Sequence, residues 1–168
     1  MKIIAWFERK MNFGLPKEML PFYLERLRGT AVRIEKKVEQ LDDRILTNQL
    51  NGKWSVKQHI GHLAEVDEIA NKRIDEMLHG NAVLSPAVFE PKNYNPWPVK
   101  AVIEYFETTR SKNLQKYQAI HPDDLLKSSE HPRLKMPMTP VDLAWFDAEH
   151  DDHHLVKINE IIFTLTKI

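Results

Sequence analysis

Residues 140–166 read PVDLAWFDAEHDDHHLVKINEIIFTLT, and this stretch decides the fold. Its apolar residues recur at steps of three and four, the spacing that gathers side chains on one face of an α-helix. Three of the seven positions on that face are polar, although a face turned toward a core normally carries Leu or Ile. A buried polar group without a partner costs on the order of 1–3 kcal/mol, so these three side chains are expected to have partners. The face comprises Leu143, Asp147, His150, His154, Ile158, Ile161 and Leu165.

His150 and His154 lie one helical turn apart on this face. Two imidazoles at that spacing are suited to bind a divalent metal ion. Two other interpretations stay open, namely solvated polar positions or core histidines bonded to backbone carbonyls. His153 lies off the face, so the periodicity favours His154 as the second ligand. Because two histidines on one helix hold a transition metal poorly, a functional site needs a third ligand from elsewhere.

The composition limits the class of protein. A chain of 168 residues, 42% hydrophobic and 29% charged, predicts a single domain over residues 1–168 that is neither disordered nor membrane-spanning. The 24 basic and 24 acidic residues balance and no dense basic segment occurs, so no nucleic-acid partner is expected. The apolar run at residues 3–7 is too short for a signal peptide or an anchor, which predicts a cytoplasmic protein without a membrane partner.

The chain contains no cysteine. This excludes a disulfide, a thiolate nucleophile and a cysteine-ligated zinc. Any metal must therefore be held by histidine and carboxylate, and any thiol chemistry would need a thiol brought by a cosubstrate.

The prolines and the apolar periodicity predict an all-α fold, a four-helix bundle with long inter-helix connections. A short extra helix at the N-terminus is compatible with this pattern. No segment shows sustained period-two alternation, so no sheet is expected. Residues 41–53 lose the pattern and are expected to be an irregular connection, whereas the longer links 79–97 and 121–138 are expected to form a crossover or a lid. The four helices are predicted at about residues 17–40, 56–78, 98–120 and 140–166.

The second predicted helix supplies the candidate third ligand. Ser55 and Gln58 form a capping box that marks where this helix begins. His62 lies on a line with Gln58, Val66, Ile69 and Arg73, at the edge of the apolar stripe. His59, one turn earlier, is the competing ligand, and a boundary histidine half in water is the alternative for either one.

Two segments resemble motifs of the DinB-like superfamily. In Trp54-Ser55-Val56-Lys57-Gln58-His59-Ile60-Gly61-His62-Leu63-Ala64-Glu65, a tryptophan and a helix cap precede a His-Leu pair. In residues 150–154, His-Asp-Asp-His-His matches the His-x-x-His-His cluster of that family's last helix. The order and spacing of the motifs agree, so the resemblance covers essentially the whole chain.

The resemblance implies a divalent metal ion, usually nickel or zinc, held by His62, His150 and His154, with His153 outside the ligand set. Three imidazoles leave coordination positions open for a small-molecule substrate, the arrangement of a catalytic site. The superfamily includes bacillithiol transferases and mycothiol-dependent maleylpyruvate isomerase. This favours transfer of a low-molecular-weight thiol cosubstrate to small electrophiles. The alternatives are a metal-dependent hydrolase and a non-enzymatic metal-binding or dimeric interaction module, and the resemblance also suggests a homodimer.

Asp147, one turn before His150, is the candidate catalytic residue, either as a proton acceptor or as a carboxylate that orients a ligand. A solvated or helix-capping Asp147 is the alternative. Asp67 is expected either to bond to a ligand histidine or to form a salt bridge with a neighbouring helix. In the long loops Tyr94, Trp97, Arg133 and Lys135 are candidate substrate contacts, and in the interaction-module alternative Trp6, Phe7 and Phe13 are exposed contacts.

Overall fold

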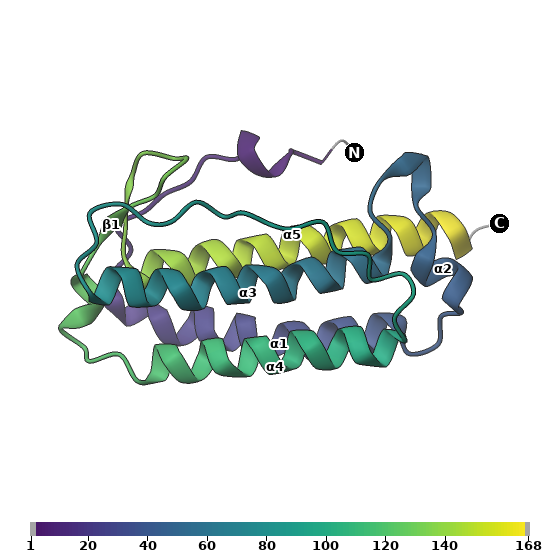
Figure 1. Ribbon diagram of the computed structural model, residues 1–168, viewed down its shortest axis with the longest axis horizontal. Coiled ribbons are helices and arrows are strands. Elements are labelled where there is room, and N and C mark those ends of the chain that lie inside the picture. The colour runs from purple at the N-terminus through teal and green to yellow at the C-terminus, as the bar shows by residue number, and fades with distance from the viewer. Residues whose placement is uncertain (1–2, 167–168) are drawn as a thin grey trace.

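The computed structural model describes residues 3–166, so both ends of the predicted 1–168 domain lie outside the described residues. The predicted all-α fold, a four-helix bundle, is confirmed (Figure 1). Among the described residues, a two-stranded hairpin and four single 3₁₀ turns accompany the helices. The first of these turns, Trp6–Glu8, lies where the sequence was compatible with a short N-terminal helix. The helices are α1 (Leu20–Val38), α2 (Asp43–Thr47), α3 (Val56–Leu78), α4 (Val99–Gln118) and α5 (Pro140–Thr166), and the strands are β1 (Ser129–Glu130) and β2 (Pro137–Met138).

The four long helices do not simply alternate in direction. α1 and α5 run one way and α3 and α4 the other (Figure 1). The parallel helices pack side by side within each pair, and across the pairs α1 packs against α4 and α5 against α3. Because α3 and α4 are parallel, the link between them must return along the whole bundle, and Figure 1 shows it doing so as a long extended segment beside α3 and α5. Of the two roles expected for this link, the crossover is therefore the one observed.

Two short elements depart from the sequence prediction. The connection after α1 contains α2, whose N-cap Asp42 accepts a hydrogen bond from the Ile45 amide at 3.0 Å. One helical turn is too short to show an apolar period, so this helix was missed. The expectation of no sheet is also wrong, since Ser129 pairs with Met138 and Glu130 with Pro137. Strands of two residues cannot display period-two alternation.

The capping box predicted for the start of α3 is confirmed. The Ser55 hydroxyl accepts from the Gln58 amide at 3.2 Å, and the Gln58 side chain accepts from the Ser55 amide at 2.9 Å. Gly80 ends the helix with a φ of 78°, a left-handed conformation that glycine adopts without steric cost. These two caps fix the length of the helix that carries His62.

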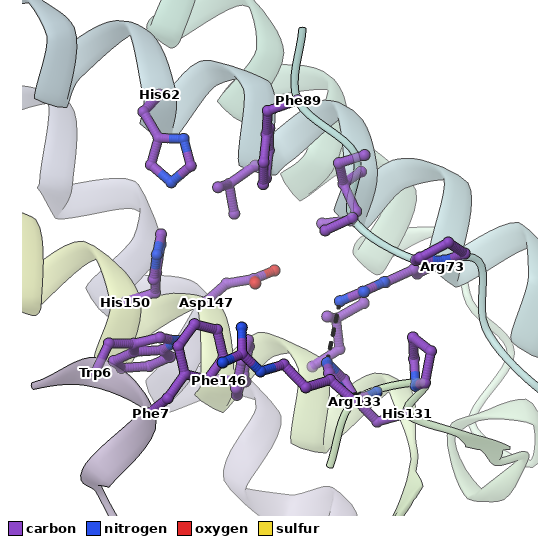
Figure 2. Close-up of a pocket in the computed structure, with 17 residues that line it drawn as sticks. Trp6, Phe7, His62, Arg73, Phe89, His131, Arg133, Phe146, Asp147 and His150 are labelled. Carbon is purple, nitrogen blue, oxygen red and sulfur yellow. Dashed lines mark hydrogen bonds between the residues drawn. The ribbon is translucent and has the colours of Figure 1, made fainter. Parts of the chain in front are cut away.

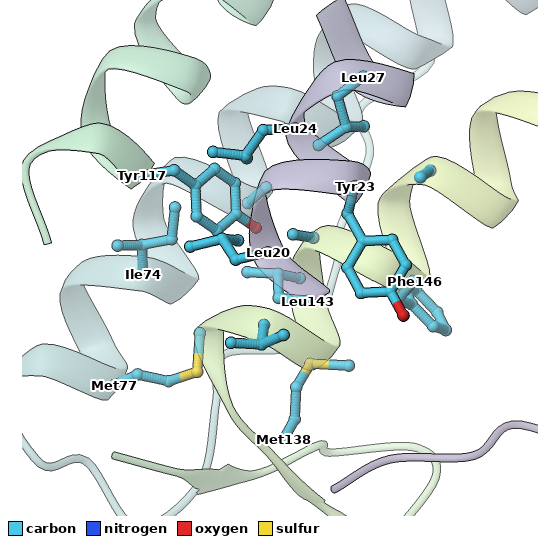
Figure 3. Close-up of a cluster of buried hydrophobic side chains, with 14 of the residues drawn as sticks. Leu20, Tyr23, Leu24, Leu27, Ile74, Met77, Tyr117, Met138, Leu143 and Phe146 are labelled. Carbon is cyan, nitrogen blue, oxygen red and sulfur yellow. The ribbon is translucent and has the colours of Figure 1, made fainter. Parts of the chain in front are cut away.

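The core consists of two apolar clusters separated by a polar layer. Figure 3 shows the first cluster, in which Ile74 and Met77 of α3 meet Tyr117 of α4 and Leu143 of α5. The second cluster is built around Ile34, Leu63, Phe106 and Ile158.

The polar layer is organised by Arg110 of α4, which is 2% exposed. Its Nε donates to both oxygens of Asp67 on α3 at 2.9 and 3.0 Å, and its terminal nitrogens donate to Asp151 on α5 at 2.6 and 3.0 Å. A further bond to the Leu27 carbonyl, at 2.9 Å, reaches α1. Burial opposes the charge, but the two carboxylates outweigh it and raise the pKa of Arg110. One side chain thus joins all four long helices.

Within residues 3–166, no helix is both long enough and apolar enough to cross a membrane. The cytoplasmic location stays a prediction.

Replacing Arg110 with Met is expected to lower the free energy of unfolding by about 3–5 kcal/mol, because it leaves Asp67 and Asp151 buried without their counter-ion. Urea denaturation followed by circular dichroism measures the change. Arg28→Met, which removes an exposed arginine paired with Glu25, is the matched control and should stay within about 0.5 kcal/mol of wild type. A loss below about 1 kcal/mol in Arg110→Met would contradict this role.

Candidate metal centre

Three histidines from two antiparallel helices converge beside the polar layer. α3 contributes His62, and α5 contributes His150 and His154. Each offers one ring nitrogen such that all three nitrogens lie within 4.8 Å of one another, and all three residues are buried. The Nε2 atoms of His150 and His154 are 3.2 Å apart. This compares with about 3.3 Å between two nitrogens that each lie 2.0–2.1 Å from a tetrahedral zinc, so the donor set fits a divalent ion.

The protonation of these rings also fits a metal centre. Burial lowers the pKa of His62 to about 4. Burial, followed by the neighbouring imidazoles, lowers the pKa of His150 and of His154 well below the ordinary value. The rings are therefore neutral at pH 7, and neutral imidazole is the form that binds a metal.

The second nitrogens of two rings have neighbours that would hold them in place. His154 Nδ1 shares a hydrogen bond of 2.7 Å with His59 Nδ1, and His62 Nδ1 lies 3.6 Å from a Glu65 oxygen. Glu65 is itself fixed by the Tyr94 hydroxyl, which donates to it at 2.7 Å. Hydrogen-bonded neighbours of this kind set the tautomer and orientation of ligand histidines.

The competing histidines take other positions. His59 is buried on the side of His154 away from His150 and bonds to the far nitrogen of the His154 ring, so it is a neighbour of the cluster and not one of its three members. His153 is half-buried beside Trp6, and its Nδ1 lies 3.4 Å from an Arg9 terminal nitrogen. His153 is therefore not a member of the three-histidine cluster.

Aromatic rings cover the cluster. Trp54 lies over His62 with 4.7 Å between ring centroids and stacks on His154 at 5.9 Å. Phe89 of the crossover meets the His62 ring edge-on at 4.7 Å, and Trp6 meets His150 at 4.9 Å. These rings border the histidine cluster.

Asp147 lies one turn from His150 and is 3% exposed, which rules out the solvated alternative. Its Oδ2 atom is buried and has no hydrogen-bond partner among the described residues. Burial, with the nearby Asp67 carboxylate, raises its pKa well above the ordinary value. Position 147 is seven residues inside α5, which also excludes a capping role.

A cavity of about 490 Å³ adjoins the cluster (Figure 2). His62, Asp147 and His150 form one end of it, and Arg73 of α3 lines the other. Two loop segments complete the wall: 86–89 of the crossover, and 131–133 from the hairpin region. The long loops therefore do contribute to the cavity, as expected.

Of the four loop residues expected to contact a substrate, only Arg133 lines the cavity. Tyr94 is buried behind α3, where a Cβ on Gly61 would lie 2.4 Å from its ring. Trp97 packs against Tyr94 at 5.4 Å, and Lys135 pairs with Glu130 at 3.3 Å. The prediction was wrong for these three residues because a loop position alone does not show which side faces the site.

The N-terminal aromatics are also corrected. Trp6 is buried against Phe146 and His150, and Phe13 packs edge-on against Trp145 and Phe146. Phe7 remains half exposed, but it lines the cavity beneath the Arg133 guanidinium. Trp6 and Phe7 thus line the cavity, whereas Phe13 packs against the core.

Sequence reasoning missed Arg73, Phe89 and His131 as lining residues. Arg73 could have been found, because it shares the helical line of His62. Phe89 and His131 come from loops without periodicity, and no local pattern places them.

A four-helix bundle with a buried histidine cluster opening on a cavity defines the class: a helical-bundle protein with a candidate metal centre. The chain belongs to the DinB superfamily, whose family model matches residues 26–158. No curated protein sequence matches it. Among solved structures it is similar to YfiT from Bacillus subtilis, with 18% identity, a TM-score of 0.81 and 94% of each chain covered. YfiT is described as "a probable metal-dependent hydrolase with an unusual four-helix bundle topology", and at this identity the likeness shows the fold.

The metal-free protein is expected to lose stability as the pH falls from 6.5 toward 4. His62 has a pKa of about 4 in the folded chain and about 6.5 in the unfolded chain, so only the unfolded chain takes up a proton in this range. The free energy of unfolding is therefore unaffected by His62 well above pH 6.5, and protonation of this residue in the unfolded chain lowers it by about 2 kcal/mol at pH 5. Urea titrations from pH 7 to 5 with a chelator present measure it. If the free energy of unfolding of His62→Leu varied with pH as steeply as that of wild type, the lowered pKa of His62 would be contradicted.

Proposed function

We propose that the protein is a metal-dependent enzyme that hydrolyses a small-molecule substrate, with a divalent ion, nickel or zinc, held by His62, His150 and His154. The observation that carries this proposal is the convergence of three neutral ring nitrogens, two of them on histidines that line one end of a cavity, His62 and His150. The description of YfiT as a probable metal-dependent hydrolase supports it. A divalent ion bound there would act as a Lewis acid and lower the pKa of water to about 7.

The protein's own groups would prepare this chemistry. His59 hydrogen-bonds the far nitrogen of His154, and a Glu65 oxygen lies 3.6 Å from the far nitrogen of His62, so that the remaining nitrogen of each ring faces the site. Trp54, Phe89 and Trp6 border the histidine cluster. We assign Asp147 as the catalytic acid-base, because it lines the cavity beside His150, its Oδ2 has no hydrogen-bond partner among the described residues, and burial raises its pKa, which favours the protonated form.

Transfer of a low-molecular-weight thiol, the activity that the family resemblance favours, stays a prediction. It would use the same three histidines and replace water with a thiol as the nucleophile. The homodimer and the non-enzymatic module also stay predictions.

Wild-type protein purified without a metal-affinity tag is expected to contain about one equivalent of divalent metal by elemental analysis. His62→Ala and His150→Ala should each lose it, because two imidazoles hold a transition metal poorly. His153→Ala, which removes a neighbouring histidine of the same helix, should keep it. The proposal fails if wild type binds no metal after reconstitution, or if His153→Ala loses metal as the other two do.

Asp147→Asn is expected to keep its metal and lose about 10²–10⁴-fold in turnover, because the amide has the same shape but cannot exchange a proton. Hydrolysis of 4-nitrophenyl acetate by metal-loaded protein is the measurement. A parallel assay couples a low-molecular-weight thiol to 1-chloro-2,4-dinitrobenzene, and activity only in that assay would show transferase chemistry instead. Loss of metal from Asp147→Asn would place this carboxylate among the ligands and contradict the catalytic role.

A further inference from the structure

Arg73 lines the end of the cavity opposite the histidines. His62, Val66, Ile69 and Arg73 follow one another at i, i+4, i+7 and i+11 on α3, so they share one line along its surface. The helical rise separates the first and last Cα atoms by about 16 Å. Figure 2 shows the Arg73 side chain reaching back into the cavity, toward the histidine end.

The Arg73 guanidinium is 5% exposed and only partly satisfied. One terminal nitrogen donates to the Ser85 carbonyl at 3.3 Å, and the other lies 3.5 Å from His131 Nε2. Its Nε is buried without a partner among the described residues. Arg73 therefore lines the cavity with hydrogen-bond donors that no described residue uses.

No carboxylate within residues 3–166 forms a salt bridge with Arg73. Glu76, three residues further along the helix, accepts from the Ser85 amide at 2.8 Å and from the Ser85 hydroxyl. Asp147 lies across the cavity (Figure 2) and acts on Arg73 only through space. A guanidinium stays protonated in proteins, and a buried charge is stable only when it is paired. The site thus calls for an anion.

The lining and the size of the cavity indicate which kind of anion would fit. The planar fork of a guanidinium matches a carboxylate, to which it can donate two parallel hydrogen bonds. Arg133, held 3.4 Å above the Phe7 ring, adds a second positive charge at the wall. Between Arg73 and the histidines the lining is apolar, with Val66, Ile69, Phe89, Leu143 and Phe146. A volume of about 490 Å³ lies within the range of small-molecule sites.

We propose that the cavity binds small organic carboxylates with an apolar body, with the carboxylate on Arg73 and the other end of the molecule beside His62 and His150. The placement of the reacting end rests on the proposed function, whereas the carboxylate site does not.

The test uses 3-phenylpropionate and its uncharged amide, 3-phenylpropionamide, as probes in calorimetric titrations of metal-free protein. Wild type is expected to bind the acid at least ten-fold more tightly than the amide. Arg73→Gln should abolish that preference, Arg73→Lys should keep part of it, and Lys100→Gln, which removes an exposed charge on α4, should keep all of it. Circular dichroism checks that each variant is folded.

The proposal is overturned if wild type binds the acid and the amide alike, if it binds neither, or if Arg73→Gln keeps the preference. If Arg73→Gln does not fold, wild type and Arg73→Lys decide the question. Because the titrations contain no metal, a failure of metal binding leaves this result standing, and a missing acid preference in protein that binds metal refutes only the carboxylate site.

Discussion

The ion pairs of Arg110 with Asp67 and Asp151 are the constraint on which the rest of this structure depends. Asp67 follows His62 by five residues on α3, and Asp151 follows His150 directly on α5. The arginine that holds the two carboxylates therefore also sets how far α5 can slide against α3, and so where the histidines meet. Thr30 of α1 donates to Asp151 at 2.6 Å and reinforces the same point. The Arg110 ion pairs therefore fix both the packing of the helices and the position of the histidines, because a buried charge tolerates little displacement from its partners.

The polar residues of α5 lie in two different surroundings, the interior of the bundle and the wall of the cavity. Asp151 points into the bundle and is satisfied by protein groups, whereas His150 and Asp147 line the cavity and each has a buried polar atom, Nδ1 and Oδ2, without a partner among the described residues. Native structures rarely leave buried polar atoms without partners unless those atoms have a function. The same contrast marks Arg73 at the other end of the cavity. A small molecule that carries an anionic group and reaches the histidines would satisfy both ends together.

The sequence predicted the bundle because helical periodicity and caps are local signals, as α5 and the Ser55 cap show. It also predicted that His62, His150 and His154 belong together, because two of them share a face and the motif names the third. It could not predict Arg110, which lies in a polar stretch of α4 with no sign that its charge is buried. Nor could it place Trp6 or Phe89, since both reach the site through long-range docking of irregular segments. The contacts that close the cavity are tertiary, and no local pattern encodes them.

Whether these three histidines form a metal centre can be seen in a crystal structure of nickel- or zinc-loaded protein, with anomalous data at the metal edge. One anomalous peak is expected about 2.0–2.1 Å from one ring nitrogen each of His62, His150 and His154. A peak bound instead by His59 or His153, or no peak in protein soaked with either metal, would contradict this assignment.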